Sequence, residues 1–300
     1  MDIFKPILKT IWFFTEKADN KRIASQTAPG GIVCKENIAY IDDYNKYHLL
    51  DFYYPENTTE NLPLIIDIHG GGWWYGTKEI NKYYCMELAK RGFIVANINY
   101  RLADRVNIAG QLADIFACLQ WIDKNSDKYY IDRNNVFLTG DSAGGQFCCL
   151  TAQINADSEL QKKLHLPKNK LSFNAAAATS PVIDLVSPNI MMNVNLNALL
   201  STTHHKSSPY YFLMQFKNIA SDSLPPFFVV TSSGDFVRAQ GRELHKILDE
   251  LNVENEFHDY TEKLDGRKLP HVFSVTMPFT APSQKCIDDL AKFFKRHIHN

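Results

Sequence analysis

Unbroken apolar runs, spaced along most of the 300-residue chain, restrict its fold more than any other feature of the sequence. In stretches such as LPLIID and GFIVANI, apolar residues follow one another without the alternation that is expected of a half-exposed strand. Such runs are typical of strands that are buried on both faces of a mostly parallel sheet. Helical patterns lie between the runs, and this order predicts an α/β fold in which helices flank a mostly parallel central sheet.

Strands and helices are expected to alternate over most of the chain. The expected strands cover residues 48–55, 62–74, 92–101, 135–142, 174–182, 225–235 and 253–261. The clearest helical patterns cover residues 81–91, 108–124, 143–156, 238–251 and 281–297. A chain of this length forms one or two domains, and we predict a single domain over residues 1–300.

Residues 183–224 break the alternation, because they form a connection that is longer than usual. They contain the apolar stretches MMNVNLNALL and SPYYFLMQF, which indicate ordered and mostly helical structure. A long ordered insertion in an α/β domain is usually a lid or a functional loop. We therefore predict a helical cap over residues 183–224.

The N-terminal segment, residues 1–25, is predicted to form an amphipathic helix, because apolar residues between Phe4 and Trp12 recur at helical spacing. Such a helix can pack on its own protein, where it would join the cap, or it can lie on a membrane. Asp2 and Lys9 interrupt the pattern of a secretory signal, and no small-residue cleavage site follows. No segment is long and apolar enough to span a bilayer. Because the pattern of a secretory signal is lacking, we expect a cytoplasmic protein.

Charge and cysteine content exclude several classes of protein. The net charge is −1 and no run of like charge occurs, so neither nucleic acid nor an anionic membrane surface is an expected partner. The six cysteines include no C-x-x-C pair, and zinc-ligand spacing is therefore absent. We expect free thiols in a reducing compartment, and neither a metal nor a cofactor.

The stretch FLTGDSAGGQFCCL places a single serine between an apolar run and a helical pattern. Gly140-Asp141-Ser142-Ala143-Gly144 fits the motif G-x-S-x-G, which presents a nucleophile at a sharp turn between a strand and a helix. The small neighbours are needed because a side chain at either outer glycine would strike an adjacent element. The alternative is an ordinary glycine-rich loop whose serine caps the following helix.

A second glycine-rich motif, HGGGWWYG at residues 69–76, directly follows a buried run. Three consecutive glycines weaken a strand, so they indicate a place where the backbone approaches a ligand. We expect the N–H groups of Gly71, Gly72 and Ala143 to form an oxyanion hole, which holds the negative oxygen of a tetrahedral intermediate. A phosphate-binding loop is the alternative, but neither G-x-G-x-x-G nor G-K-[ST] is present.

Together the two motifs resemble the hormone-sensitive-lipase-like branch of the α/β-hydrolase fold, a family of esterases and lipases. The similarity continues from residue 62 to the C-terminus in the segments NYRLA, SSGDFVRAQGRELHKIL and LPHVFSV. The resemblance implies a catalytic triad of Ser142, Asp235 and His271, in the chain order of this fold. In such a triad the histidine is the general base and the aspartate orients its imidazole.

Other residues of the right chemical type leave alternatives open for two of these roles. Asp184 and Asp265 remain alternatives for the acid, and the chain has ten histidines in all. His69 opens the glycine loop, and the resemblance implies that it anchors this loop by hydrogen bonds rather than by acting on the substrate.

The residues beside the two motifs are expected to shape the substrate pocket. Trp73 and Trp74 would narrow it, with core packing as the alternative for at least one of them, and Asp141 would lie next to the nucleophile. A confined apolar pocket favours short-chain acyl or small aryl esters, so we predict a serine carboxylic-ester hydrolase that works through an acyl-enzyme. The resemblance also makes a homodimer an expectation, because members of this family often dimerise.

Several other functions share the same residues. The fold and the triad do not specify the bond that is cleaved, so an amide hydrolase of the formamidase or peptidase type is one alternative. An acetyl-sugar or hydroxycinnamoyl esterase is another. A non-catalytic ligand-binding protein on the same fold is the third, although such proteins lack a member of the triad.

Overall fold

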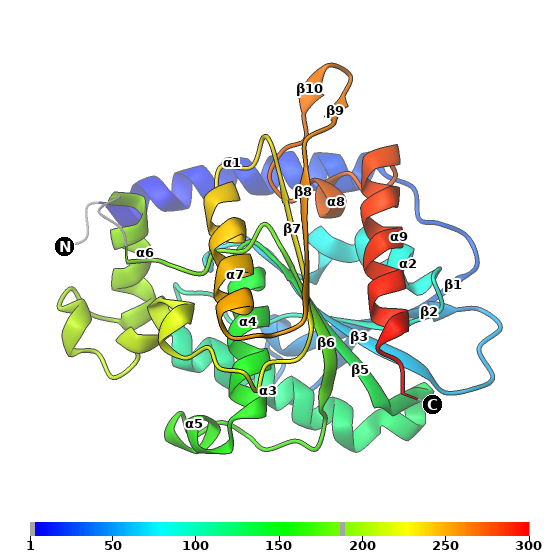
Figure 1. Ribbon diagram of the computed structural model, residues 1–300, viewed down its shortest axis with the longest axis horizontal. Coiled ribbons are helices and arrows are strands. Elements are labelled where there is room, and N and C mark those ends of the chain that lie inside the picture. The colour runs from blue at the N-terminus through cyan, green and yellow to red at the C-terminus, as the bar shows by residue number, and fades with distance from the viewer. Residues whose placement is uncertain (1–3, 187–189, 300) are drawn as a thin grey trace.

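The computed structural model describes residues 4–186 and 190–299, with side chains from residue 10 onward except in residues 190–193. This part of the chain contains an eight-stranded sheet of order β1-β2-β4-β3-β5-β6-β7-β8 (Figure 1). The strands are β1 (Ile32–Ala39), β2 (Leu49–Pro55), β3 (Leu62–Ile68), β4 (Ile94–Ile98), β5 (Ile131–Asp141), β6 (Phe173–Thr179), β7 (Phe227–Ser232) and β8 (Asn255–Tyr260). β2 is antiparallel to β1 and β4, whereas the neighbours from β4 to β8 are all parallel. The predicted mostly parallel sheet is confirmed.

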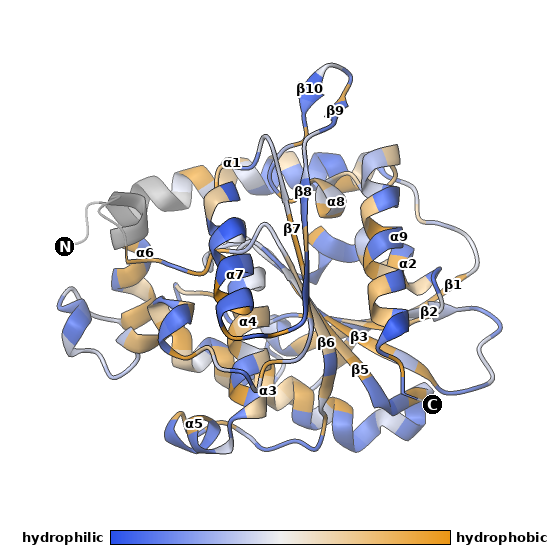
Figure 2. Ribbon diagram, in the orientation of Figure 1, coloured by the Kyte–Doolittle hydropathy of each residue, from blue (hydrophilic) through white to orange (hydrophobic). Residues whose placement is uncertain are grey.

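Helices cover both faces of the sheet (Figure 1). One face carries α3 (Ile108–Asn125), α4 (Ala143–Ala156) and α7 (Arg238–Glu250), and the other carries α2 (Lys82–Ala89), α8 (Phe273–Thr276) and α9 (Ala281–Arg296). Successive residues of a strand point to opposite faces. In β3, Leu64 and Ile66 therefore belong to one hydrophobic core, and Ile65 belongs to the other. Two buried faces explain why the inner strands are apolar runs. Figure 2 shows hydrophobic residues along β3 and β5, whereas the edge strand β8 is mostly hydrophilic.

The N-terminal helix and the insertion lie together beside this layered core. α1 (Phe4–Ser25) crosses the top of the molecule in Figure 1, and α6 (Ile190–Leu200) lies near its N-terminal end. After α6, residues 201–224 form three short 3₁₀ turns, His205–Ser207, Tyr211–Met214 and Phe216–Asn218. The predicted apolar side chains of Phe4, Ile7 and Leu8, and residues 187–189 of the predicted cap, lie outside the described residues. Among the described residues, no helix has the length and hydrophobicity that crossing a bilayer requires.

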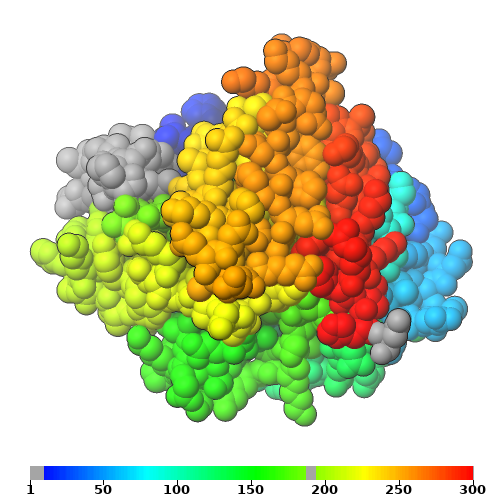
Figure 3. Space-filling view, in the orientation of Figure 1, coloured from blue at the N-terminus to red at the C-terminus, as the bar shows by residue number. Residues whose placement is uncertain are grey.

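Three further elements were not predicted. β1 is an edge strand whose middle residues are exposed, and the short helix α5 (Ser158–Lys163) is mostly polar. The hairpin of β9 (Lys263–Leu264) and β10 (Arg267–Lys268) projects from the body of the molecule, as Figures 1 and 3 show. Exposed or very short elements bury too little apolar surface to produce a hydrophobic period in the sequence.

The start of α4 lies unusually close to the end of β3. A Cβ at Gly144 would be 2.0 Å from the carbonyl oxygen of Ile68 and 2.6 Å from that of His69. Both neighbours are backbone atoms, so no side chain can move aside to relieve the contact. Only glycine at position 144 therefore lets the helix begin at this distance from the strand.

Gly144→Ala is expected to lower the free energy of unfolding by about 3 kcal/mol, because α4 has to move away from β3. Urea unfolding followed by tryptophan fluorescence measures the change. Gly30→Ala is the matched control, because a Cβ at Gly30 meets no atom within 4 Å. Equal stability of the two variants would contradict the proposed role of this contact.

Candidate active site

Three side chains from different parts of the chain meet at the carboxyl ends of the parallel strands. Ser142 follows β5, Asp235 follows β7, and His271 follows the β9–β10 hairpin. His271 Nε2 lies 2.9 Å from Ser142 Oγ, and His271 Nδ1 lies 2.7 Å from Asp235 Oδ1. An ionised carboxylate can only accept, so Nδ1 carries the hydrogen and Nε2 is left to accept from the serine hydroxyl. The structure thus joins the three residues that the resemblance had singled out.

The turn at Ser142 holds its backbone in an uncommon conformation. Its φ is 53° and its ψ is −115°, while its N–H donates to Thr179 O at 2.9 Å and its carbonyl accepts from Val182 N at 3.2 Å. A Cβ at Gly140 would lie 2.2 Å from the carbonyl oxygen of Gly144. A strained backbone conformation of this kind persists only where the surrounding structure holds it in place. Here the neighbouring strand and the two glycines fix the serine at the corner between β5 and α4.

Asp235 is anchored by further donors besides His271. Thr231 Oγ1 donates to Asp235 Oδ2 at 2.9 Å, and the N–H of Val237 donates to Oδ1 at 2.9 Å. Burial alone would raise the pKa of Asp235, but the hydrogen bond and the charge of His271, together with the Val237 N–H, outweigh it and lower this pKa. The carboxyl group is therefore ionised at neutral pH and oriented toward the imidazole.

The glycine loop bends over Ser142 in a backbone conformation that favours glycine. Gly71 and Gly72 have φ values of 107° and 57°, and a Cβ at Gly71 would lie 2.0 Å from the carbonyl oxygen of Tyr75. Both glycines line the same cavity as Ser142. Within the described part of the chain, the N–H groups of Gly71 and Gly72 donate to no other protein group. The two amides are therefore free to receive an acceptor from a ligand.

A buried polar network fastens this loop to the turn that carries Ser142. Asp141 Oδ1 accepts from the N–H of Gly70 at 2.9 Å and from Asn81 Nδ2 at 2.8 Å. Asn81 Nδ2 also donates to Asp67 Oδ2 at 2.8 Å, so one amide group bridges two buried carboxyl groups. Burial raises the pKa of Asp141, and the hydrogen bonds from Asn81 and Gly70 offset part of this effect. Asp141 was predicted as a pocket residue, and it lines the cavity while also holding the loop.

His69 occupies a structural position under the same loop. Its Nδ1 lies 2.7 Å from Gly70 O, and its ring stacks on Tyr100 with centroids 4.5 Å apart. Burial lowers the pKa of His69 to about 4, so the ring is neutral near pH 7. A neutral Nδ1–H can donate to the Gly70 carbonyl, which fits the expectation that His69 anchors the loop.

The cavity beside Ser142 has a volume of about 460 Å³ and a mostly apolar lining. Residues that line it include Trp12, Trp73, Val182, Asn195, Phe236 and Val275. Phe236 is 79% exposed, and its ring lies 4.3 Å from that of His271, centroid to centroid. Trp12 comes from α1 and Asn195 from α6, so both the N-terminal helix and the insertion contribute to the wall.

The two tryptophans of the glycine loop have different surroundings. Trp73 lines the cavity, although it is only 2% exposed, and its Nε1 donates to Gln146 Oε1 at 2.8 Å. Trp74 does not line this cavity: its Nε1 donates to Asn195 Oδ1 at 3.0 Å, and its side chain borders a neighbouring cavity instead. Trp74 is buried, which fits core packing, the alternative that was kept open for at least one of the two tryptophans. Trp73 has a φ of 67°, which turns the chain so that consecutive side chains diverge.

The alternative acids lie elsewhere. Asp184 accepts from Val186 N and from Gln215 Nε2, and Asp265 is in the turn of the projecting hairpin. Neither is among the residues that line the cavity of Ser142. The cavity is also lined by Trp12, Asn81 and Phe236, which were not predicted. Nothing in their local sequence shows which side chains from distant elements will lie beside them.

The fold and this arrangement of serine, histidine and aspartate define the α/β-hydrolase class of esterases. The sequence profile of the BD-FAE family matches residues 50–248, and the chain belongs to this family. The crystal structure of esterase B from Lactobacillus rhamnosis with a C4-C4 SN3 tributyrin phosphonate has a TM-score of 0.90 and 28% sequence identity. That comparison covers 97% of this chain and 94% of the other.

Curated relatives agree with this assignment. Carboxylesterase NlhH from Mycobacterium tuberculosis is 24% identical over 71% of this chain and 69% of its own length. Arylacetamide deacetylase from Bos taurus is 33% identical over 37% of this chain, and the match spans 30% of that protein's length. These similarities confirm the resemblance to esterases of the α/β-hydrolase fold.

Asp67 offers a test of the buried network through pH. Burial raises the pKa of Asp67 to about 8, and the charge of Asp141 contributes to this shift. The folded protein therefore keeps a proton that the unfolded chain loses near pH 3.8, the ordinary pKa of an aspartate. Stability therefore declines as pH rises from about 4 to about 8. In Asp67→Asn this loss is absent, so the variant should gain stability relative to wild type across that window.

Urea unfolding at several pH values between 4 and 9 measures this difference. Asp222→Asn, at an exposed carboxyl group, is the matched control and should show no comparable trend. A difference between Asp67→Asn and wild type that stays constant with pH would show that Asp67 is already ionised in the folded protein.

Proposed function

We propose that this protein is a serine carboxylesterase that hydrolyses esters through a covalent acyl-enzyme. The observation that carries the proposal is the continuous hydrogen-bonded chain from Ser142 through His271 to Asp235, which opens into an apolar cavity. Fold and family agree with this activity. The chain needs no further chemical group for this reaction, because the histidine can carry the proton in both steps.

In the first step Ser142 Oγ attacks the ester carbonyl carbon while its proton passes to His271 Nε2. Asp235 stabilises the imidazolium that forms, since its carboxylate accepts from Nδ1. The tetrahedral intermediate collapses, the C–O bond breaks, and the imidazolium donates its proton to the leaving alcohol. Water then gives a proton to His271 and attacks the acyl-enzyme, which releases the carboxylic acid and restores Ser142.

The negative oxygen of each tetrahedral intermediate would be held by the amides of Gly71, Gly72 and Ala143. Support comes from the free N–H groups of the two glycines and from the position of Ala143 at the first turn of α4, where backbone N–H groups have no partner within the helix. Asp141 would keep the loop in place through the Gly70 amide. Amides that are already oriented in a dry cavity stabilise developing charge strongly, because they need no rearrangement during the reaction.

The proposed substrates are small esters with short acyl chains or small aryl groups. A cavity of about 460 Å³ lies at the small end of the usual range for ligand sites, and its walls are mostly apolar. The related esterase B was crystallised with a tributyrin phosphonate, which also supports short acyl groups here. Residues 183–224 and α1 are proposed to act together as a cap, since Asn195 and Trp12 both border the cavity.

We also propose that the protein is cytoplasmic and that it forms a homodimer. The six cysteines are free thiols, and burial raises the pKa of Cys148 and Cys149 on α4. Unpaired cysteines are usual in a reducing compartment. Cell fractionation tests the location, and recovery of the native protein outside the cytoplasm would contradict it. Light scattering on the purified protein tests the dimer, and a monomer mass would contradict that proposal.

Ser142→Ala is expected to reduce kcat on p-nitrophenyl butyrate by about 10⁴- to 10⁶-fold, because the nucleophile is removed while the fold is kept. Rates on p-nitrophenyl esters from acetate to palmitate, measured for wild type and variant, test this. Wild-type activity should be highest on the short chains. Labelling of wild type, but not of the variant, by a fluorophosphonate probe should report the same loss.

A folded wild-type protein that cleaves none of these esters would overturn the proposal. An equal rate for the Ser142→Ala variant would also overturn it, because the serine would then have no part in the reaction. Circular dichroism of both proteins establishes that they are folded. Amide substrates in the same panel separate an esterase from an amide hydrolase.

A further inference from the structure

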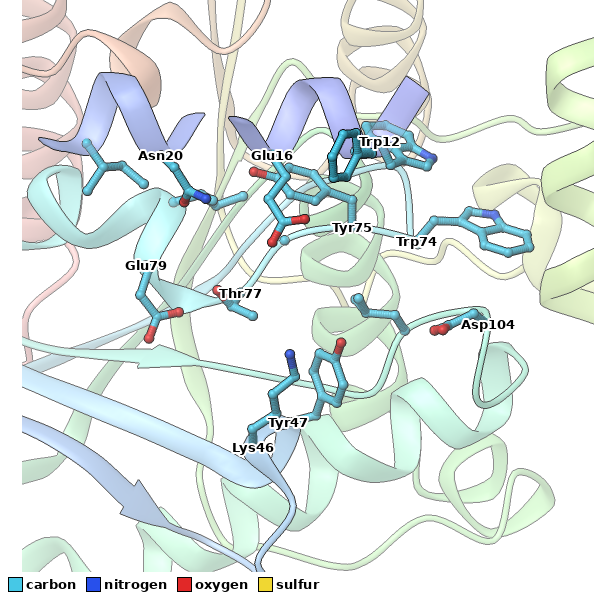
Figure 4. A pocket seen from close by; sticks show the side chains of 15 residues that line it. Trp12, Glu16, Asn20, Lys46, Tyr47, Trp74, Tyr75, Thr77, Glu79 and Asp104 are labelled. Atoms are coloured by element: carbon cyan, nitrogen blue, oxygen red, sulfur yellow. The ribbon is translucent and has the colours of Figure 1, made fainter. Parts of the chain in front are cut away.

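A second cavity adjoins the active-site cavity. It has a volume of about 350 Å³ and is bordered by residues of α1, of the loop after Trp74, and of the segment around Lys46 and Tyr47 (Figure 4). Trp12, Tyr75 and Ile80 border both cavities. These shared side chains therefore form a wall between the two spaces.

Two aromatic rings make up the main part of this wall. The rings of Trp12 and Tyr75 are stacked, with centroids 5.6 Å apart and planes inclined by 12°. The hydroxyl of Tyr75 donates to Asp19 Oδ2 at 2.9 Å, and Asp19 is on the same helix as Trp12. The stack thus closes the space between α1 and the glycine loop.

The helix that carries Trp12 is tied to the body of the protein. Arg22 donates to Ile80 O and to Thr276 O, both at 3.2 Å, and Gln26 donates to Thr276 O at 3.1 Å. Both acceptors belong to residues that border the active-site cavity. The position of Trp12 relative to the cavity is therefore set by specific contacts near the C-terminal end of α1.

The indole of Trp12 lies directly against the glycine loop. A Cβ at Gly72 would be 2.4 Å from the Trp12 ring atom Cζ2 and 2.7 Å from Cη2. Gly72 is one of the two glycines that line the cavity of Ser142 and whose N–H groups donate to no other group in the described part of the chain. The ring therefore borders the active-site cavity next to the glycine loop.

The space behind this wall is much more polar than the active-site cavity. Figure 4 shows Glu16 pointing into it from α1 and Lys46 extending toward it from the opposite side. Asn20 and Asp104 also border it, and Tyr47 adds an aromatic ring. Such a mixture of acceptors, donors and a ring suits an uncharged group that carries hydroxyls, because a hydroxyl both donates and accepts.

We propose that Trp12 is the residue that limits substrate size, and that the polar cavity behind it is an extension of the substrate site that the indole closes off. The proposal rests on the esterase function proposed above. It assigns the preference for small esters to one side chain of the N-terminal helix. Removing the ring would join the two cavities and admit a longer or bulkier group.

Trp12→Ala is the direct test, measured with two series of esters. The first varies the acyl chain in p-nitrophenyl esters from acetate to decanoate, and the second varies the alcohol in butyrate esters from ethyl to hexyl and glyceryl. The ratio of kcat/KM for the long member to that for the short member should rise at least tenfold in one series. In the alcohol series the glyceryl ester should gain most, because its hydroxyls can pair with the polar side chains that border the opened space. The series that responds shows which part of the ester faces the wall.

Tyr75→Ala opens the same wall from the other side and should shift the same series. Phe14→Ala is the matched control, because Phe14 is 63% exposed on the same helix and borders neither cavity. Its ratios should stay within twofold of wild type. Thermal unfolding of each variant shows whether α1 is still in place. Trp12→Phe keeps a smaller ring, so its kcat/KM ratios should lie between those of wild type and Trp12→Ala.

Unchanged ratios in both series, for folded Trp12→Ala and Tyr75→Ala proteins that still cleave butyrate, would overturn the proposal. An equal fall in all rates would also overturn it, because that pattern belongs to a structural role. This outcome is distinct from failure of the esterase function, which would appear as inactivity of the wild type on every ester.

Discussion

The close contact between the backbones of α4 and β3 is the constraint on which the site depends. β3 continues into the glycine loop and α4 begins after Ser142, so the distance between these two elements sets the distance between the loop and the hydroxyl. Gly144 makes this contact possible from the helix. Gly140, near the end of β5, is needed for a second close approach, because a Cβ there would strike the carbonyl oxygen of Gly144. A side chain at either position would strike backbone atoms, which cannot rotate away. The packing density of a protein interior turns this local requirement into a rigid geometry.

Buried polar groups also join β3 and the glycine loop to the end of β5, next to Ser142. Asp141 receives an N–H from the glycine loop, and Asn81 connects it to Asp67 in β3. A displaced loop would leave polar groups without partners in a dry interior, which costs more than breaking a hydrogen bond in water. Steric contact and electrostatics therefore favour the same placement of the glycine loop. The helix α1 completes the cavity, because Trp12 packs against Gly72.

Residues of the site differ in how far the sequence could place them. Ser142 and the glycine loop carry local signals, because a strained turn and a close backbone approach both restrict the residue types that fit. The resemblance extended this to Asp235 and His271, which the structure brings into hydrogen-bonding distance. Trp73 and Trp74 are neighbours in the sequence, yet of the two only Trp73 lines the cavity. For Trp12 the sequence predicted an amphipathic helix that could join the cap, but its place beside Gly72 depends on the path of α1 across the molecule.

The sequence by itself determined the buried strands, the helices between them and the positions where only glycine fits. These features follow from sterics and hydrophobic periodicity, which act within a few residues of each position. The tertiary structure alone decided which aromatic rings line the cavity, how two cavities share the wall of Trp12 and Tyr75, and why Asp67 holds its proton. Those properties depend on burial and on contacts between distant segments, and both arise only when the whole chain has packed.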